Sequence, residues 1–198
     1  GFDAVAEVLI ARGAKQTINT VDTDKGYSAL LLAARVGKRS LVRLLIAAAA
    51  DVNLRRPPDG RPCPPSDGRP TALIAASWAG FESVTCELLA SGAVVDVQKD
   101  NGFSALMSAC YNGHYQTARL LLQNGASINL ADDNGYSALQ LACKEGIGNI
   151  VSLLIRHNTA VNACNAQGKS ALMTCCASKQ DRTTCIDLLL AANAELEA

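Results

Sequence analysis

One stretch, residues 101–129, decides the fold of this chain, and it reads NGFSALMSACYNGHYQTARLLLQNGASIN. The stretch that begins at residue 134, NGYSALQLACKEGIGNIVSLLIRHNTAVN, aligns with it in register. Gly102, Gly135 and Gly168 follow one another at intervals of 33 residues. A fixed period of this size predicts stacked copies of one supersecondary unit, in which each copy needs its neighbours to bury its apolar face.

Each copy is predicted to hold two helices. The first helices are expected from 28 to about 35 and near 71–79, 104–112, 137–145 and 170–178, each capped by a Ser or Thr: Ser28, Thr71, Ser104, Ser137 and Ser170. The second helices are expected near 39–48, 82–91, 115–124, 148–157 and 183–192. Later copies have Gly or Asn after the second helix, as a left-handed cap prefers, whereas Ala49 stands there in the early copy. We therefore expect a frayed or different helix end at Ala49.

The copies together predict a single domain over residues 1–198. It comprises a half repeat at 1–21, repeats at about 22–53, 66–97, 99–131, 132–164 and 165–198, and a Pro/Arg-rich insertion at 54–70. All six prolines lie in the insertion, so it is predicted to be an extended or turn-rich loop. It could be a tolerated surface loop or an arm that contacts a partner. The leading half copy and the apolar last copy indicate an excerpt of a longer array.

Composition limits the function classes. The chain is 49% hydrophobic with a formal net charge of zero, which gives no electrostatic basis for binding nucleic acid or a membrane surface. No apolar run reaches the length of a membrane helix, so we expect no membrane insertion, and we expect a monomer. Of the eight cysteines, Cys110, Cys143 and Cys176 share one small slot with Ala34 and Ser77. Buried reduced thiols predict an intracellular protein, in the cytoplasm or the nucleus.

The repeat unit resembles the ankyrin repeat over essentially the whole chain. The family pattern is a loop with Asp and Gly, Thr-Pro-Leu-His, a helix, Gly-His, a second helix ending in Leu-Leu, and Gly-Ala. The residues at family positions in the central copy are Gly102, Leu106, Ala109, Gly113, His114, Leu121, Leu122, Gly125, Ala126 and Asn129. The resemblance implies an all-α solenoid of stacked antiparallel helix pairs with projecting hairpin-like loops. It also implies a concave surface, lined by the loops and first helices, that binds other proteins.

The Pro and His of Thr-Pro-Leu-His are absent from every copy, where Ser-Ala-Leu or Thr-Ala-Leu stands instead. Loss of the His is expected to remove hydrogen bonds that tie neighbouring loops and to lower stability. His114 follows a loop glycine and is expected to form a structural hydrogen bond. Neither histidine has a motif-level nucleophile or paired carboxylate, and no phosphate-binding glycine motif occurs. We therefore predict a protein without catalysis, cofactor or metal.

Two rows of residues vary while the scaffold repeats. The row at the end of the first helices is Arg35, Trp78, Tyr111, Lys144 and Ala177. The row after the loop glycines is Tyr27, Arg69, Phe103, Tyr136 and Lys169. By the family geometry both face the concave side, flanked by Val36, Asn112 and Glu145. Exposed Trp, Tyr and Arg are typical of interface hot spots. The alternative for the three rings after the glycines is that they pack on the neighbouring loop.

The leading hypothesis is a module that binds a protein or an extended peptide on this face, within a larger scaffold or signalling protein. One alternative is sensing of a small ligand or nucleic acid, because cations and rings alternate along the first row. Another is a purely architectural spacer. Leu45 to Asn53 is also similar to the loop sequence that asparaginyl hydroxylases modify in this family. Asn53 is therefore a candidate for hydroxylation. The alternative is that Asn53 only hydrogen-bonds its loop.

Overall fold

The computed structural model describes residues 17–22, 26–55, 68–177 and 181–194. These residues form five antiparallel helix pairs and no strand, and two isolated bridges join Val21 to Ser28 and Ala131 to Ser137. The pairs are α2 (Ala29–Arg35) with α3 (Arg39–Ala47), α4 (Ala72–Ala79) with α5 (Glu82–Ala90), α6 (Ala105–Tyr111) with α7 (Tyr115–Gln123), α8 (Ala138–Glu145) with α9 (Gly148–Arg156), and α10 (Ala171–Cys176) with α11 (Thr183–Ala191). The predicted all-α repeat solenoid is confirmed.

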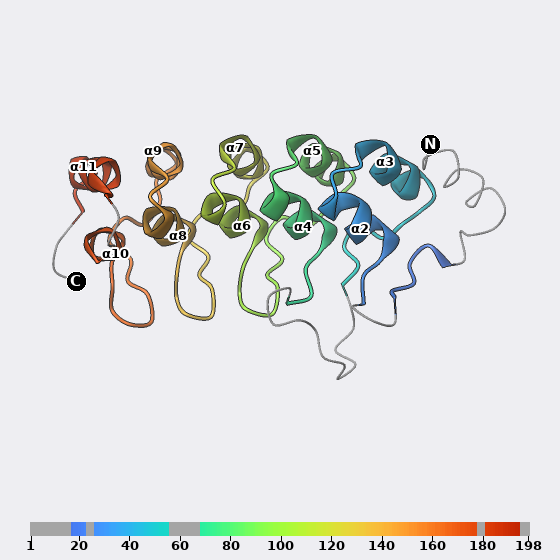
Figure 1. Cartoon of the computed structure of the whole chain (residues 1–198), viewed down its shortest axis with the longest axis horizontal. Helices are drawn as coiled ribbons and strands as arrows, with labels where there is room; N and C mark the ends of the chain where they lie inside the picture. Colours follow the sequence, from blue (N-terminus) through green and yellow to red (C-terminus); the bar gives the residue numbers. More distant parts are fainter. Residues whose placement is uncertain (1–16, 23–25, 56–67, 178–180, 195–198) are drawn as a thin grey trace.

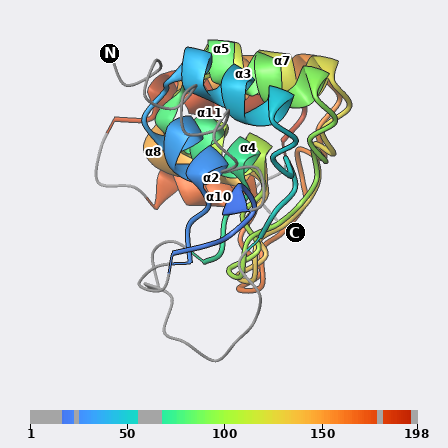
Figure 2. The same ribbon diagram turned by 90° about the vertical axis from the view of Figure 1, so that its right-hand side faces the viewer.

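The helices lie in two rows. Figure 1 shows the inner row, α2, α4, α6, α8 and α10, between the outer row and the loops that project from one edge. In Figure 2 the loops stand away from the helix layers, so the cross-section is L-shaped. One buried apolar cluster runs from Ile18 to Leu189, because each inner helix packs against the next one along the array. No helix pair has a core of its own, as expected for a solenoid.

Every inner helix begins with the predicted cap. The hydroxyl of Ser28, Thr71, Ser104, Ser137 or Ser170 accepts a hydrogen bond from the backbone N–H three residues later. This bond satisfies one of the free donors of the first turn. At Ser137 the side chain of Gln140 also accepts from the backbone N–H of Ser137, which completes a capping box. The caps fix where each copy turns from loop into helix.

The expectation of a frayed or different helix end at Ala49 was wrong. Ala49 adopts a left-handed conformation with φ of 70°, and its N–H donates to the carbonyl of Ile46 at 2.9 Å. The N–H of Ala50 donates to Leu45 at 2.9 Å. These bonds close the helix in the manner of the Gly and Asn residues at the same position in later copies. The chain must turn there to reach the next loop, so alanine adopts a conformation that is costly for it.

Loss of the family His was expected to remove the hydrogen bonds that tie neighbouring loops. This expectation was wrong for one copy. Gln140 occupies that position, and its amide donates to the carbonyls of Ala163 and Lys169 at 3.1 and 2.8 Å. The buried Gln140 therefore joins α8 to the following loop. The corresponding residues Leu31 and Ile74 are aliphatic and pack in the apolar interior.

The predicted cysteine slot is buried at Cys110 and Cys143 but exposed at Cys176. Cys175 of α10, the inner helix of the next copy, lies against Cys143, and no described inner helix follows α10. Its neighbour Cys175 is buried instead. Burial raises the pKa of the Cys110 thiol far above its usual range.

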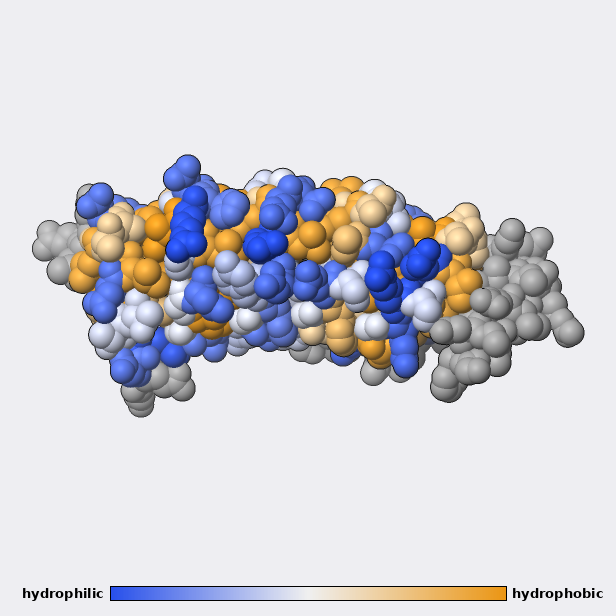
Figure 3. Space-filling view, turned by 90° about the horizontal axis from the view of Figure 1, so that it is seen from above, coloured by the Kyte–Doolittle hydropathy of each residue, from blue (hydrophilic) through white to orange (hydrophobic). Residues whose placement is uncertain are grey.

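Within the described parts of the chain, no helix is both long and apolar enough to cross a membrane, and no His, Cys, Asp and Glu side chains gather into a group of three that could hold a metal ion. Figure 3 looks onto the outer helices and shows hydrophilic and hydrophobic residues interspersed along this face. Arg39 and Arg43 on α3 pair there with Glu87 on α5, at 3.2 and 3.5 Å. Because such exposed pairs contribute little, the stack depends on its apolar interior.

Candidate functional site

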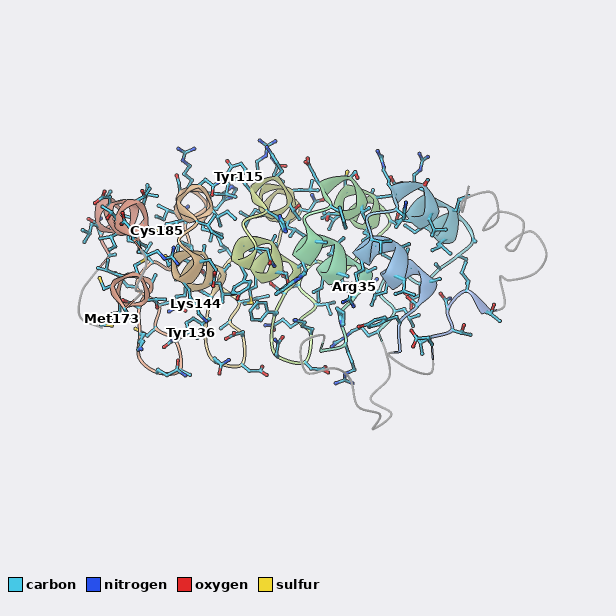
Figure 4. All side chains as sticks on the ribbon, in the orientation of Figure 1. Arg35, Tyr115, Tyr136, Lys144, Met173 and Cys185 are labelled. Carbon is cyan, nitrogen blue, oxygen red and sulfur yellow. The ribbon has the colours of Figure 1, made fainter. Side chains whose placement is uncertain are left out.

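The first predicted row lies along the ends of the inner helices. Figure 4 shows Arg35 and Lys144 on the loop side of those helices, with Tyr136 below Lys144, while Tyr115 lies on the outer row. Trp78 has 43% of its surface exposed and stacks on Tyr111, with ring centroids 5.7 Å apart and an interplanar angle of 22°. Phe103 meets the edge of Tyr111 at 6.1 Å. The structure thus gathers three rings from two helices and a loop into one aromatic cluster.

The second row is less exposed than the sequence predicted. Tyr27 is buried, with 6% of its surface accessible, and clusters with Leu31 and Ala75. Its hydroxyl accepts a hydrogen bond from Arg35 at 2.9 Å. Tyr27 therefore holds the Arg35 side chain in place through this hydrogen bond, and Tyr27 itself is too buried to contact a partner. Phe103 and Tyr136 are half-buried against the core. All three rings thus pack in part against the helices.

The two remaining charged positions have local partners. Arg69 has φ of 49° and contacts the carboxylate of Asp100 at 2.6 Å. The Lys144 ammonium lies 5.6 Å from the centre of the Tyr136 ring. Asn112 ends α6 and donates to the Ser108 carbonyl at 2.9 Å.

Lys99 is the residue that the sequence interpretation missed. It is only 8% exposed, although lysine is among the residues most rarely buried. Its ammonium lies 5.3 Å from the ring centres of both Trp78 and Phe103. Attraction between a cation and the ring faces offsets part of the cost of removing the charge from water. Lys99 thus places a positive charge within the aromatic cluster.

The repeat pattern contained a signal for Lys99. The corresponding residues Asp22, Asp132 and Asn165 use a side-chain oxygen to accept backbone N–H groups of their own loop. A lysine cannot accept these bonds. In its loop Asn101 accepts from the N–H of Phe103, and Gln98 donates across to the carbonyl of Ala131 at 2.8 Å. Lys99 thus stands where other copies have a hydrogen-bond acceptor, and neighbouring side chains make the loop bonds in its place. This substitution indicates that Lys99 has a role other than loop closure.

A pocket of about 340 Å³ opens beside Trp78 between α2 and α4. Its lining residues are Leu31 and Arg35 from α2, Ile74, Ala75, Trp78 and Ala79 from α4, and Pro70 and Lys99 from the loops. The lining is apolar except for two cationic side chains. This combination of an apolar pocket with a few polar groups is typical of sites that bind a specific ligand.

Comparison with known proteins places this geometry in a family. A family model described as ankyrin repeats in three copies matches residues 58–132 and 125–198, and one for a single ankyrin repeat matches residues 25–56. The chain belongs to the ankyrin-repeat family. It is also similar to a putative ankyrin repeat-containing protein of Treponema pallidum (strain Nichols), with 47% identity over 55 residues. That match covers 28% of this chain and 18% of the relative, so the chain spans a small part of the relative's length.

Ankyrin-repeat proteins are in general interaction modules that bind other proteins and do not catalyse reactions. In this ankyrin array the predicted hydrogen bond of His114 is present. Its Nε2 lies 3.0 Å from the carbonyl oxygen of Trp78, so Nε2 carries the hydrogen. The imidazole also covers Gly80, where an added Cβ would lie 2.4 Å from its Nδ1. His114 therefore ties the end of α4, and with it Trp78, to the next repeat.

Asn53 lies in the loop after α3. Its side-chain oxygen accepts from the N–H of Val94 at 2.8 Å, and its amide donates to the carbonyl of Gly92 at 3.2 Å. Asn129 makes a similar tie one repeat later, accepting from the N–H of Ala160 at 2.9 Å. Asn53 thus joins its loop to the next repeat rather than bonding only within its own loop, and Asn53 is exposed.

Proposed function

We propose that this ankyrin array is a non-catalytic interaction module that binds a protein or peptide on its concave face. The observation that carries the proposal is the exposed Trp78, stacked on Tyr111 and bordered by the buried cation Lys99 and the apolar pocket. Large rings held in place beside a cation are the groups that dominate interface energies. We further propose that the module acts as a monomer within a larger scaffold or signalling protein.

An intracellular setting, in the cytoplasm or the nucleus, is part of the proposal. It is supported by the thiols of Cys110, Cys143, Cys175 and Cys185, which pack in the core as small apolar groups.

The test compares proteins retained from cell lysate by the wild type and two variants. In the first, Trp78→Ala with Tyr111→Ala removes the stacked pair. The matched control, Arg119→Ala with Arg156→Ala, alters exposed residues on the outer helices α7 and α9. Circular dichroism confirms that all three are folded. We expect specific partners to be retained by the wild type and the control and lost from the first variant. An identical set of proteins from all three would refute binding at Trp78 and favour a spacer.

We also propose hydroxylation of Asn53, which rests on the likeness of its loop to family substrates. The exposed Asn53 side chain holds the loop to the next repeat through Val94 and Gly92, so an enzyme must loosen these bonds to reach its Cβ. Mass spectrometry of protein from its native cell should find one added oxygen atom at Asn53. An unmodified peptide in every preparation would count against the proposal.

A further inference from the structure

We propose that the pocket between α2 and α4 binds the C-terminal residue of a partner peptide. The apolar side chain of that residue lies on the pocket floor, and its free carboxylate lies against Arg35 and Lys99. The inference rests on the proposed peptide-binding function and specifies which part of a peptide the array recognises.

The floor of the pocket favours an apolar side chain. Leu31, Ile74 and Ala75 form it, and all three are buried in the core. Burial of apolar ligand surface there is favourable, and a polar side chain would lose its water without gaining a partner. The volume of about 340 Å³ is near the lower limit for ligand pockets. It suits one amino-acid residue better than a nucleotide.

The charged lining favours a carboxylate. Both charged residues among those that line the pocket, Arg35 and Lys99, are cations. The bond from Arg35 to the Tyr27 hydroxyl orients the guanidinium, and the rings of Trp78 and Phe103 hold the Lys99 ammonium. Pre-oriented cations bind carboxylates through charge-assisted hydrogen bonds. A ligand carboxylate would add to, or exchange with, the contacts that these two cations already make.

A chain terminus meets both requirements in one residue. An internal Asp or Glu also carries a carboxylate, but its short aliphatic stem would leave the floor formed by Leu31 and Ile74 uncovered. The last residue of a peptide has a free carboxylate beside an apolar side chain. Its preceding residues can then extend from the pocket toward the exposed faces of Trp78 and Tyr111.

Lys99 is the residue that would decide specificity. In three of the other repeats Asp22, Asp132 and Asn165 occupy its position and close the loop with their oxygen atoms. An acidic residue at position 99 would repel a ligand carboxylate. Replacement of the loop acceptor by a buried cation makes this pocket different from the equivalent places along the array.

Trp78 supplies the assay, because it is the single tryptophan of the chain and lines the pocket. Its fluorescence is followed while four pools of random hexapeptides are added: free acids ending in Leu or Phe, the same peptides as C-terminal amides, amides containing an internal Glu, and amides containing phosphotyrosine. We expect a saturable change with the free acids and binding weaker by about 10-fold or more with their amides, since a charged hydrogen-bond partner is removed.

Three variants separate the role of Lys99 from general effects. Lys99→Met keeps the length of the side chain and should weaken free-acid binding about 10-fold. Lys99→Asp should restore the loop acceptor, remain folded by circular dichroism, and lose binding. Lys38→Met removes an exposed lysine outside the pocket and should leave affinity unchanged.

Equal binding of free acids and amides, stronger binding of the Glu or phosphotyrosine pool, or no saturable change with any pool would overturn the pocket assignment. The proposed function would survive each of these results if the variant lacking Trp78 and Tyr111 still loses partners. Unchanged free-acid binding by Lys99→Asp would likewise overturn the inference.

Discussion

Replacement of Gly102 by alanine tests whether the projecting loops form a rigid stack. Gly102 has φ of +81°, and a Cβ at this position would lie 2.6 Å from both the Cα of Asp132 and the backbone nitrogen of Asp133. Gly168 occupies the same place in the last repeat with φ of +72°, and a Cβ there would meet nothing within 4 Å. The two glycines therefore share a conformation and differ in whether another loop lies against them.

The expected magnitudes follow from this difference. A left-handed alanine destabilises the folded state by about 1–2 kcal/mol. Alanine also lowers the entropy of the unfolded chain, which stabilises the fold by about 0.4–1 kcal/mol. Gly168→Ala should therefore destabilise the protein by roughly 1 kcal/mol. Gly102→Ala adds an overpacking cost of about 1–3 kcal/mol. It also weakens the bond from the Asp133 N–H to the Asn101 carbonyl, which contributes about 1 kcal/mol. We expect Gly102→Ala to be less stable than Gly168→Ala by about 2–4 kcal/mol.

Urea unfolding followed by far-UV circular dichroism and by Trp78 fluorescence measures both free energies of unfolding. Agreement between the two probes checks that the array unfolds cooperatively, which repeat proteins do not always do. Gly125→Ala is an interior control, since Gly125 has φ of +82° and open space at its Cβ. If Gly102→Ala falls within about 0.5 kcal/mol of both controls, the loops give way easily and the stack is not rigid.

Three further predictions concern single positions. Ala49→Gly should stabilise the protein by about 0.5–1 kcal/mol in the same urea assay, because it relieves a left-handed alanine; a loss of stability would contradict this. Iodoacetamide should label Cys176 in the native protein and Cys110 only after unfolding, because burial excludes the reagent and raises the pKa of Cys110; mass mapping that finds equal labelling would refute it. Hydrogen bonds from the Thr183 hydroxyl and N–H lower the pKa of Asp181. The ionised Asp181 carboxylate therefore stabilises the fold at neutral pH, and this stabilisation is lost as the pH falls below the usual aspartate range. Amide exchange at the start of α11 should therefore be faster in Asp181→Asn than in wild type at neutral pH, with no difference at pH ~2; a difference independent of pH would contradict the assignment.

Local features of the chain were predictable because they depend on residues close in sequence. The cap residues Ser28 and Ser104 locate helix starts by their own hydrogen bonds, and the 33-residue period locates the pairs. His114 was predicted to hydrogen-bond from its place after a loop glycine. Its partner, the carbonyl of Trp78 36 residues earlier, is known only from the structure.

Three of the features that were wrong or missed depend on neighbours from other repeats. Tyr27 was placed on an open row, but Ala75 from the next repeat covers it. Cys176 was placed in a buried slot, but the slot needs a following inner helix. Lys99 was overlooked because its significance depends on the ring of Trp78, from the inner helix of the preceding repeat, which lies against its ammonium.

The sequence by itself determined the repeat, the helix pairs and the set of variable residues, since these depend on periodicity and on short-range hydrogen bonds. Only the tertiary structure decided which of those residues are exposed and which meet in a pocket. The physical reason is that a solenoid buries side chains between successive copies. Exposure, charge environment and pocket shape at Trp78 and Lys99 are therefore properties of three successive repeats and not of any one alone.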